Sequence, residues 1–230
     1  MNTAIVLAGG FGTRLLSITK DIIPKPMVLV QGKPFLYWLL RYLKSQRIEE
    51  VILAVSHRAA VIENYFGNSF EGILLKYSVE AKSLGTGGAI KQAFSFTNTN
   101  SAYIINGDTY FPVNLLKMKS FHHHLHGEVT IALKMLRSFD RYGAITLDSQ
   151  QWIKAFHEKK MVTQGYINGG IYLMDRRVLN GFEDGQSFSI EKDFFEKQVS
   201  FRIGGFKSRA NFIDIGIPEE YQRIQSFHLQ

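Results

Sequence analysis

The sequence predicts a three-layer α/β fold with a mixed, mostly parallel central sheet. Two observations lead to this prediction. In the first half of the chain, short apolar runs alternate with segments whose apolar residues recur at helical spacing, the pattern of parallel βαβ units. In the second half, closely spaced strand-like runs precede two further helices. We therefore expect one domain over 1–230, with a first half, 1–110, and a mixed second half, 111–230.

The elements of the first half follow in order from local signals. The run TAIVLA is apolar and ends at Gly9-Gly10, which predicts a buried strand. The segment PFLYWLLRYLKSQ begins with proline and repeats apolar residues at helical spacing, which predicts a helix. A later helix is expected to stop at Gly67. The expected series is strand 3–8, helix 34–46, strand 50–56, helix 58–67, strand 73–79, helix 86–96 and strand 102–106.

The second half changes character after Asp108, where strands become closely spaced. The expected series here is helix 113–126, strands 128–136, 142–148, 151–158 and 169–175, helix 190–199, strands 201–206 and 210–216, and helix 218–227. No internal repeat, low-complexity segment or long linker interrupts the sequence. This continuity favours a single domain over two independent modules.

Composition narrows the class of protein. The chain has 230 residues, 45% of them hydrophobic and 20% charged, which is typical of a soluble globular domain. No apolar run is long enough to predict a transmembrane helix, and the start MNTAIVLAGG lacks the basic region of a signal peptide. The absence of cysteine excludes disulfides and thiolate metal sites. Together these features predict a cytoplasmic protein with no membrane partner.

The formal net charge of +7 predicts an anionic partner. The basic residues are scattered singly or in pairs and form no basic arm or block. Nucleic-acid-binding proteins more often concentrate such residues in one stripe. The distribution therefore favours small phosphorylated ligands over nucleic acid.

The stretch after the first strand is rich in glycine, with Gly9, Gly10 and Gly12 within four positions. Glycines there let the backbone turn tightly, so that successive N–H groups point into one cavity and bind phosphate oxygens. Neither common phosphate motif fits, because no lysine follows Gly12 as in a P-loop and position 15 is leucine where a dinucleotide motif needs glycine. The glycines alone leave a plain tight turn as an equal alternative.

Two cations favour the phosphate-binding interpretation. Arg14 offers a planar fork of donors suited to bidentate phosphate binding. Lys25 stands between Pro24 and Pro26, whose rings restrict the local backbone. A lysine fixed in this way is better explained by a placed ammonium group than by a solvated surface charge.

The motif LAGGFGTRL…PKPM resembles the signature of the sugar-phosphate nucleotidyltransferases. Further segments match that family in the same order, namely LGTGGAI, NGD, YGAI, EKK, NGGIY, EKDFF and DIGIPEEY, so the resemblance covers essentially the whole chain. Within the family the pattern is most similar to the enzymes that transfer GMP to D-glycero-D-manno-heptose 1-phosphate. The resemblance implies a Rossmann-like nucleotidyltransferase fold, with a nucleotide-binding first half and a sugar-phosphate-binding second half.

The resemblance implies a reaction between a nucleoside triphosphate and a sugar 1-phosphate that releases pyrophosphate. Arg14 and Lys25 are the implied catalytic residues. The attacking phosphate is already ionised near neutral pH, so the protein needs neither a nucleophile nor a general base. Its work is to position two anions and to stabilise charge in the transition state.

Two aspartates are expected to hold Mg²⁺. Asp108 follows YIING at the end of an expected strand, and Asp214 lies in NFIDIG, again at an expected strand end and two residues before a glycine. Ligands of α/β sheets bind at such strand ends, and Mg²⁺ is usually held by one or two carboxylates together with phosphates and water. For Asp108 a turn role is the alternative, since Asn-Gly-Asp also favours turns.

The remaining expected contacts fall into two groups. Glu80 and the glycines of LGTGGA are expected to surround the base, with the glycines allowing close backbone approach; a solvated Glu80 at a strand end is the alternative. The resemblance implies nucleotide binding by Leu7, Ala8, Gly9, Gly10, Gly12, Thr13, Glu80, Gly85, Thr86, Gly87 and Asp108, and sugar-phosphate binding by Gly143, Glu158, Lys159, Asn168 and Gly169.

Glu80 gives a physical reason to expect GTP as the donor. One carboxylate can accept both N1–H and N2–H₂ of guanine, whereas thymine or uracil offers a single N–H. The expected sugar is D-glycero-α-D-manno-heptose 1-phosphate, on the resemblance alone. Thymidylyl-, uridylyl- and cytidylyltransferases for other sugar phosphates remain alternatives.

Two other classes of protein are alternatives to a nucleotidyltransferase. A nucleotide-sugar-dependent glycosyltransferase usually carries a D-x-D motif, which this sequence lacks. A non-catalytic nucleotide binder would not need the full set of Arg14, Lys25, Asp108 and Asp214. The histidines of HHHLH are interpreted as a polar helix end and not as a metal site, because no partner carboxylate motif accompanies them. A homo-oligomer stays open.

Overall fold

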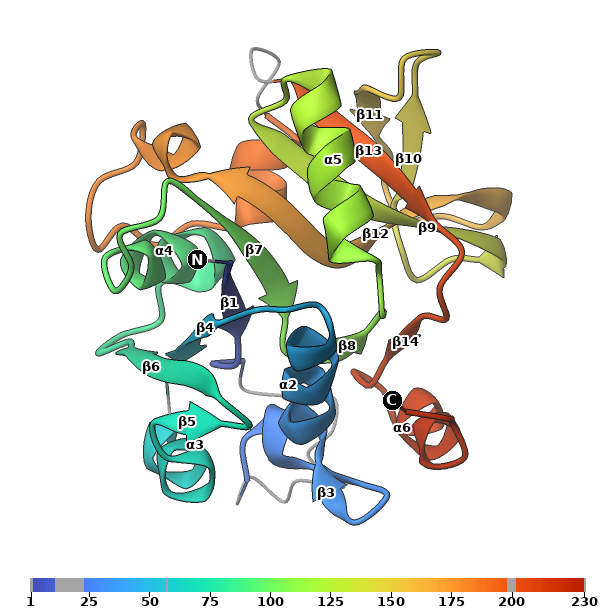
Figure 1. Ribbon diagram of the computed structural model, residues 1–230. Coiled ribbons are helices and arrows are strands. Elements are labelled where there is room, and N and C mark those ends of the chain that lie inside the picture. Colours follow the sequence, from blue (N-terminus) through green and yellow to red (C-terminus); the bar gives the residue numbers. More distant parts are fainter. Residues whose placement is uncertain (1, 11–22, 57, 198–201, 230) are drawn as a thin grey trace.

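A computed structural model describes residues 2–10, 23–56, 58–197 and 202–229. Within these residues ten strands form one sheet, whose main order is β11-β10-β12-β7-β1-β4-β6-β5, with β9 pairing both β12 and β13 (Figure 1). The strands are β1 Thr3–Leu7, β4 Glu50–Val55, β5 Ser69–Phe70, β6 Ile73–Val79, β7 Ser101–Asn106, β9 Val129–Phe139, β10 Ala144–Leu147, β11 Ile153–Phe156, β12 Val162–Asp175 and β13 Ile203–Ser208.

The first half is the parallel part of the sheet, as predicted. Strand β1 pairs in parallel with β4 on one side and β7 on the other, and β4 pairs in parallel with β6. A helix lies between successive strands of this set because parallel neighbours need a crossover connection. These helices are α2 Phe35–Ser45, α3 Ala59–Phe66 and α4 Gly85–Phe94.

The second half adds antiparallel pairing. Strand β12 runs antiparallel to β7, β9 and β10, whereas β13 is parallel to β9. The register between β12 and β9 shifts between Asn168 and Tyr172. The second half also contains α5 Leu115–Leu125, α6 Pro218–Gln225 and the short helical turns η3 Arg176–Leu179 and η4 Ile190–Phe195.

Several elements differ from the sequence prediction. The strand expected at 169–175 begins at Val162, because its first part pairs with β9 and lies outside the continuous apolar run. The helix expected at 190–199 is a six-residue π-helical turn among the described residues. Short pieces were not predicted: the turn η2 Lys25–Met27 and the strands β2 Leu29–Val30, β3 Lys33–Pro34, β5, β8 Thr109–Tyr110 and β14 Ile213–Asp214, the last within an expected longer strand.

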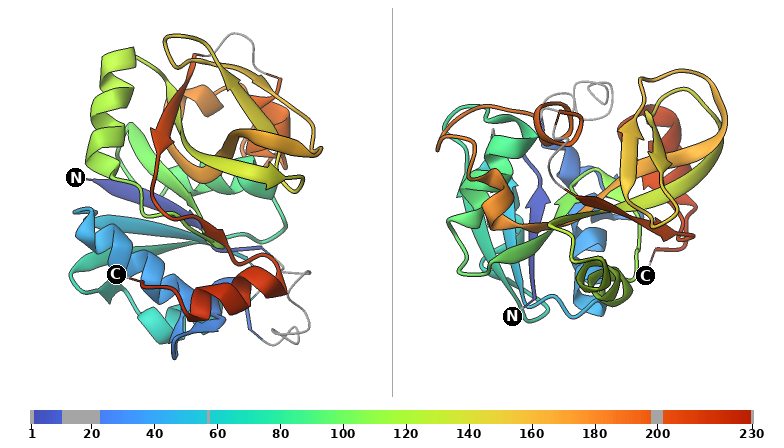
Figure 2. Two further views of the ribbon diagram at one scale, coloured as in Figure 1. Left: turned by 90° about the vertical axis from the view of Figure 1, so that its right-hand side faces the viewer. Right: turned by 90° about the horizontal axis from the view of Figure 1, so that it is seen from above.

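Two apolar cores lie on the two faces of the sheet and complete the three layers. One core combines sheet residues with α2, α3, α5 and α6, and the other combines the opposite sheet face with α4, η3 and η4. Figure 1 shows α2 and α5 in the foreground, and Figure 2 shows the sheet between its helical layers from two further directions. No helix in the described ranges is long and apolar enough to cross a membrane.

Helix α6 brings the end of the chain back to the first half (Figure 2). Its Ile224 is fully buried in the core that contains α2. The Tyr221 hydroxyl donates to the Leu29 carbonyl at 2.6 Å, and the Gln31 side chain donates to the Phe227 carbonyl at 2.6 Å. The hairpin that follows Lys25 is therefore held by the far end of the chain.

Two histidines of HHHLH have structural roles in and beside helix α5. His122 is buried, and its Nδ1 lies 2.8 Å from the Thr130 hydroxyl of β9. His126 is the C-terminal cap of α5 in the left-handed conformation. The residues that the structure describes contain no group of three or more His, Cys, Asp or Glu side chains placed to hold a metal. His122 is thus a core residue, more deeply buried than a polar helix end.

Candidate active site

Three cavities lie in a row at the carboxyl ends of β1 and β7. The large cavity measures about 710 Å³ and is lined from both halves of the chain, including Asp108, Arg141, Lys159, Asn168 and Asp214. The central cavity, about 180 Å³, is lined by Leu7, Gly10, Lys25, Pro26, Thr86, Asn106, Gly107 and Asp108. The Glu80 cavity, about 150 Å³, is lined by Leu7, Gly9, Gly10, Ala54, Ser56, Glu80, Ser83, Gly85, Thr86 and Ala89.

Shared walls make these cavities one continuous site. Asn106 and Asp108 line both the large and the central cavity, and Leu7, Gly10 and Thr86 line both the central and the Glu80 cavity. The parallel register that places Leu7 opposite Asn106 brings these walls together. Strand ends of an α/β sheet therefore form the site, where the sequence placed it.

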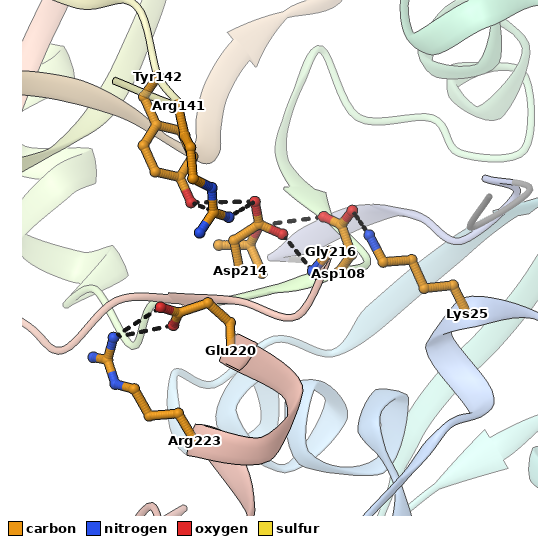
Figure 3. Close-up of polar contacts among 9 residues, drawn as sticks. Lys25, Asp108, Arg141, Tyr142, Asp214, Gly216, Glu220 and Arg223 are labelled. Atoms are coloured by element: carbon orange, nitrogen blue, oxygen red, sulfur yellow. Dashed lines mark hydrogen bonds and ion pairs between the residues drawn. The ribbon is translucent and has the colours of Figure 1, made fainter. Parts of the chain in front are cut away.

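Lys25 and Asp108 join in the central cavity. Lys25 begins η2 directly after Pro24, which is extended, and its Nζ lies 2.5 Å from Asp108 Oδ2 (Figure 3). The Lys25 side chain is only 12% exposed. The other carboxylate oxygen of Asp108 accepts from the Thr109 hydroxyl at 3.2 Å. Two residues far apart in sequence thus meet in one cavity.

Asp214 lies beside Asp108 because β14 pairs with β8, which places Asp214 opposite Thr109. Its Oδ1 accepts from the Gly216 N–H at 2.8 Å, and its Oδ2 accepts from the Tyr142 hydroxyl at 3.3 Å (Figure 3). Burial raises the pKa of the Tyr142 hydroxyl, and the charge of Asp214 raises it further. Tyr142 therefore stays protonated and can donate to this carboxylate.

The neighbourhood of Gly216 shows how closely the acids and the lysine converge. A Cβ on Gly216 would lie 2.7 Å from Asp214 Oδ1 and 3.1 Å from Lys25 Nζ. Lys25 Nζ therefore lies close to Asp214 as well as to Asp108. Two convergent carboxylates are a donor set that suits Mg²⁺, which completes its coordination with phosphate and water.

Glu80 points into its cavity. Its Oε2 accepts from the Leu84 N–H at 2.9 Å, while Oε1 faces Gly9, where an added Cβ would come within 3.2 Å. Ser56 fixes the same turn by donating to the Gly9 carbonyl at 2.5 Å. Burial raises the pKa of the Glu80 carboxyl, and the bond from Leu84 partly offsets this. The half-buried side chain does not match the alternative of a fully solvated residue.

Two glycines of LGTGGA pack against another segment of the chain. A Cβ on Gly87 would lie 2.0 Å from the Phe188 ring, and one on Gly88 would lie 2.4 Å from the Gln186 carbonyl. The N–H of Gly87 donates to the Phe188 carbonyl at 2.9 Å. Gly87 and Gly88 thus make room for the 186–188 segment, and Gly87 lines none of the three cavities. Gly85 and Thr86 do line the Glu80 cavity.

The expected sugar-phosphate residues are mostly brought together. Gly143, Lys159, Asn168 and Gly169 line the large cavity. A Cβ on Gly143 would lie 2.5 Å from the His157 carbonyl, which explains why glycine is needed at that position. Glu158 differs from the expectation, because it is exposed and does not line the cavity, whereas its neighbours His157 and Lys159 do.

A partly buried hydrogen-bond network that the sequence did not reveal connects the two halves. Glu191 of η4 accepts from the Thr86 hydroxyl at 2.8 Å and from the Tyr172 hydroxyl at 3.3 Å. Asn168 donates to that same Tyr172 hydroxyl at 3.0 Å. Thr86 of the first half is therefore linked to Asn168 of the second half. The motif EKDFF was recognised in the sequence, but only the fold shows what its glutamate contacts.

The structure describes only some of the residues near the N-terminus that were expected to bind the nucleotide. Leu7, Gly9 and Gly10 line the cavities, and Ala8 follows β1, with its N–H donating to the Ala54 carbonyl at 2.8 Å. Gly12, Thr13 and Arg14 lie outside the described residues. Arg141, Tyr142 and Asn106 line the large cavity although no role had been predicted for them.

A central cavity with a fixed lysine and Asp108, between the large cavity that Asp214 lines and the Glu80 cavity, is the arrangement expected for nucleotidyl transfer. The chain belongs to the nucleotidyl transferase family, whose model matches residues 3–230. This confirms the family that the motifs indicated.

Individual relatives are similar over almost their whole length. The chain is 46% identical to the D-glycero-alpha-D-manno-heptose 1-phosphate guanylyltransferase of Campylobacter jejuni, covering 95% of this chain and 96% of that protein. It is 45% identical to the protein of the same name from Aneurinibacillus thermoaerophilus, covering 96% of each. Among solved structures, HddC from Yersinia pseudotuberculosis complexed with GMP-PN superposes with a TM-score of 0.87 at 35% identity over 98% of both chains.

Proposed function

We propose that this protein transfers GMP from GTP to D-glycero-α-D-manno-heptose 1-phosphate, releasing pyrophosphate and forming a nucleotide-activated heptose. The observation that supports this best is the row of three adjoining cavities, with the Lys25–Asp108 pair in the central one. The names of the two relatives near 45% identity support both the base and the sugar. The GMP-PN complex of HddC supports a guanine nucleotide as ligand.

In this proposal the nucleotide occupies the Glu80 and central cavities. Glu80 accepts N1–H and N2–H₂ of guanine, for which its cavity-facing carboxylate is suited. The backbone of Gly9 and Gly10 lies along the wall, and the triphosphate reaches Lys25. Arg14 is assigned to the same phosphates on the family resemblance, and Gly12 and Thr13 to the nucleotide.

The sugar 1-phosphate occupies the large cavity, whose lining includes Gly143, Lys159, Asn168 and Gly169. Its phosphate oxygen attacks the α-phosphorus of GTP in line, forming the new P–O bond as the bond to the pyrophosphate oxygen breaks. No proton needs to be removed, since the attacking oxygen is already ionised. Lys25 stabilises the charge that develops on the phosphates. Contact with Glu158 requires that side chain to turn inward.

Mg²⁺ is the proposed cofactor, held by Asp108 and Asp214. The convergence of these carboxylates beside Lys25 fits a hard cation with oxygen ligands. When bound, the ion supplies charge neutralisation between the two phosphate groups. A cytoplasmic location is part of the proposal, since nucleoside triphosphate is available there, and nucleic acid is not a proposed partner.

A pyrophosphate-release screen tests the proposal. GTP, ATP, UTP, CTP and dTTP are each offered with heptose, mannose and glucose 1-phosphates, with Mg²⁺ or with excess EDTA. We expect the highest kcat/KM for GTP with the heptose substrate, a product of the mass of GDP-heptose, and no turnover in EDTA. Best use of a pyrimidine triphosphate contradicts the base, best use of another sugar contradicts the heptose, and full activity in EDTA contradicts the metal.

A further inference from the structure

Arg141 occupies a place in the site that its sequence neighbourhood did not predict. It follows β9 and lines the large cavity beside Tyr142. Its guanidinium lies over the Tyr142 ring, 5.4 Å from the centroid, and its Nη2 donates to the Tyr142 hydroxyl at 3.4 Å. The same nitrogen is 3.9 Å from Asp214 Oδ2 (Figure 3). The cation is thus aimed at the carboxylate pair.

The guanidinium of Arg141 still has donors to offer. Arginine carries five N–H donors in a fixed fork. The contact with Asp214 is too long for a hydrogen bond, and the bond to Tyr142 uses one donor. With a side chain that is 38% exposed, the remaining donors can face an incoming ligand. Stacking on Tyr142 limits the orientations of the fork, which lowers the entropy lost when it binds.

The charges of the large cavity indicate which ligand this fork meets. Its lining carries the cations Arg141, Lys159 and Lys192 and the acids Asp108, Asp214, Glu191 and Glu196. Among the described residues, Arg141 is the cation of this set that lies within 4.0 Å of an aspartate of the pair. The attacking phosphate has to stand next to that pair to reach the α-phosphorus. A planar fork at this point matches a phosphate bidentately.

We propose that Arg141 binds the phosphate group of the sugar 1-phosphate and that Tyr142 and Asp214 hold its guanidinium ready for this. The inference rests on the proposed function and adds a substrate-contacting residue to it. Arg141 orients the attacking oxygen and offsets the repulsion between the two substrates' phosphates. Lysine at this position would supply the charge without the fork.

The test compares Arg141→Ala and Arg141→Lys with the matched control Arg137→Ala, which removes an exposed arginine of β9 outside the cavity lining. Calorimetry gives the Kd of the sugar 1-phosphate, and steady-state kinetics give both KM values. Because hydrogen bonds to charged groups contribute about 1.5–3 kcal/mol, we expect Kd and KM for the sugar phosphate to rise about 10–100-fold in Arg141→Ala. The KM for GTP should change little, Arg141→Lys should be intermediate, and Arg137→Ala should match wild type.

Two outcomes would overturn the inference. If Arg141 only balances the charge of Asp214, Arg141→Ala changes the Mn²⁺ affinity measured by electron paramagnetic resonance but leaves the sugar-phosphate Kd unchanged. If the KM for GTP rises and that for the sugar phosphate does not, the guanidinium contacts the nucleotide instead. Failure of the proposed function shows separately, in wild-type protein that uses another substrate pair, and the same comparison is then made with that pair.

Discussion

Lys25 shows how one cation can be positioned before any substrate arrives. Pro24 and Pro26 flank it, and the Met27 N–H donates to the Pro24 carbonyl at 2.8 Å, which closes a tight turn around the lysine. The ammonium group forms an ion pair with Asp108, so the Lys25 side chain is held both at its backbone and at its tip. The sequence predicted the fixed backbone from the two prolines. Its partner Asp108 could not be predicted from the sequence, because Asp108 follows β7, which is far from Lys25 along the chain.

Replacing Lys25 by methionine should reduce kcat by about 10²–10³, because the variant loses one donor to charge that develops in the transition state. The thermal transition should remain that of a folded protein, since the aliphatic stem is retained. Lys33→Met is the control, as Lys33 lies on the exposed hairpin over the Tyr37 ring. Single-turnover rates at saturating substrates measure the effect, and a near-normal rate in Lys25→Met contradicts the assigned role.

Glu80 should give GTP binding a dependence on pH. The pKa of its carboxyl is raised by burial, and only the ionised form accepts two N–H groups from guanine. The affinity for GTP should therefore rise with pH through this raised pKa, and Glu80→Gln should lack that part of the profile. Binding titrations of a fluorescent GTP analogue at several pH values give the pH profile of affinity for both proteins. Identical profiles would show that the substrate phosphates alone titrate.

The raised pKa of Glu80 also predicts how stability depends on pH, and this dependence runs opposite to that of GTP affinity. A raised pKa in the folded state means that the protonated carboxyl is the better tolerated form, so its stabilisation is present below the unfolded pKa and is lost as pH rises through the folded value. At neutral pH Glu80 thus costs stability, and Glu80→Gln should unfold at a higher temperature than wild type while discriminating less between GTP and other donors. A lower melting temperature would place Glu80 in a stabilising contact.

At the scale of elements, the sequence predicted the repeating parts of the fold and missed the short ones. The helix at 34–46 and the strand at 50–56 are found as α2 and β4, because apolar spacing over many residues is a strong signal. Strands such as β8 and β14 have two residues each and are fixed by pairing with one another. They nevertheless help to place Asp108 and Asp214. The proposed metal-binding role of these two residues was predicted from the resemblance and from their position at strand ends, and not from the short strands that hold them.

The LGTGGA motif lies at the start of helix α4, as predicted, but its glycines also make packing contacts that the sequence did not show. Gly87 and Gly88 make room for the 186–188 segment, and this contact leads into Ser189 and Glu191 of the network between the cavities. Periodicity within one segment cannot show that a segment about one hundred residues away needs the space. The identity of the glycines was therefore informative, while their neighbour was not predictable.

Gly87→Ala should destabilise the protein by about 1–3 kcal/mol, because its Cβ would overlap the Phe188 ring and force that segment to move. The displaced segment carries Glu191, so the KM values should rise as well. Gly181→Ala is the matched control, since nothing lies within 4 Å of a Cβ there. Urea denaturation and kinetics on both variants check this, and equal stability of the two would remove the packing argument.

At the scale of the whole molecule, the arrangement of the sheet and of α6 indicates how many domains the chain contains. The sheet runs without a break from β5 to β11, and β12 of the second half pairs with β7 of the first. Ile224 of α6 is buried in the core shared with α2 and α3. These contacts support the proposal that 1–230 is one domain, with a site that needs both halves.

One cooperative unfolding transition is therefore expected, although chains of this size often unfold through intermediates. The two tryptophans report on different halves, Trp38 from α2 and Trp152 from the residues before β11. In the variants Trp38→Phe and Trp152→Phe, fluorescence and far-ultraviolet circular dichroism should give the same urea midpoint. Ile224→Ala, added to each, should lower the free energy of unfolding by about 2–5 kcal/mol in both, since its cavity opens in a core that belongs to the whole chain. If the fluorescence of one tryptophan shifts with Ile224→Ala while that of the other stays, the halves unfold separately and the single-domain proposal fails.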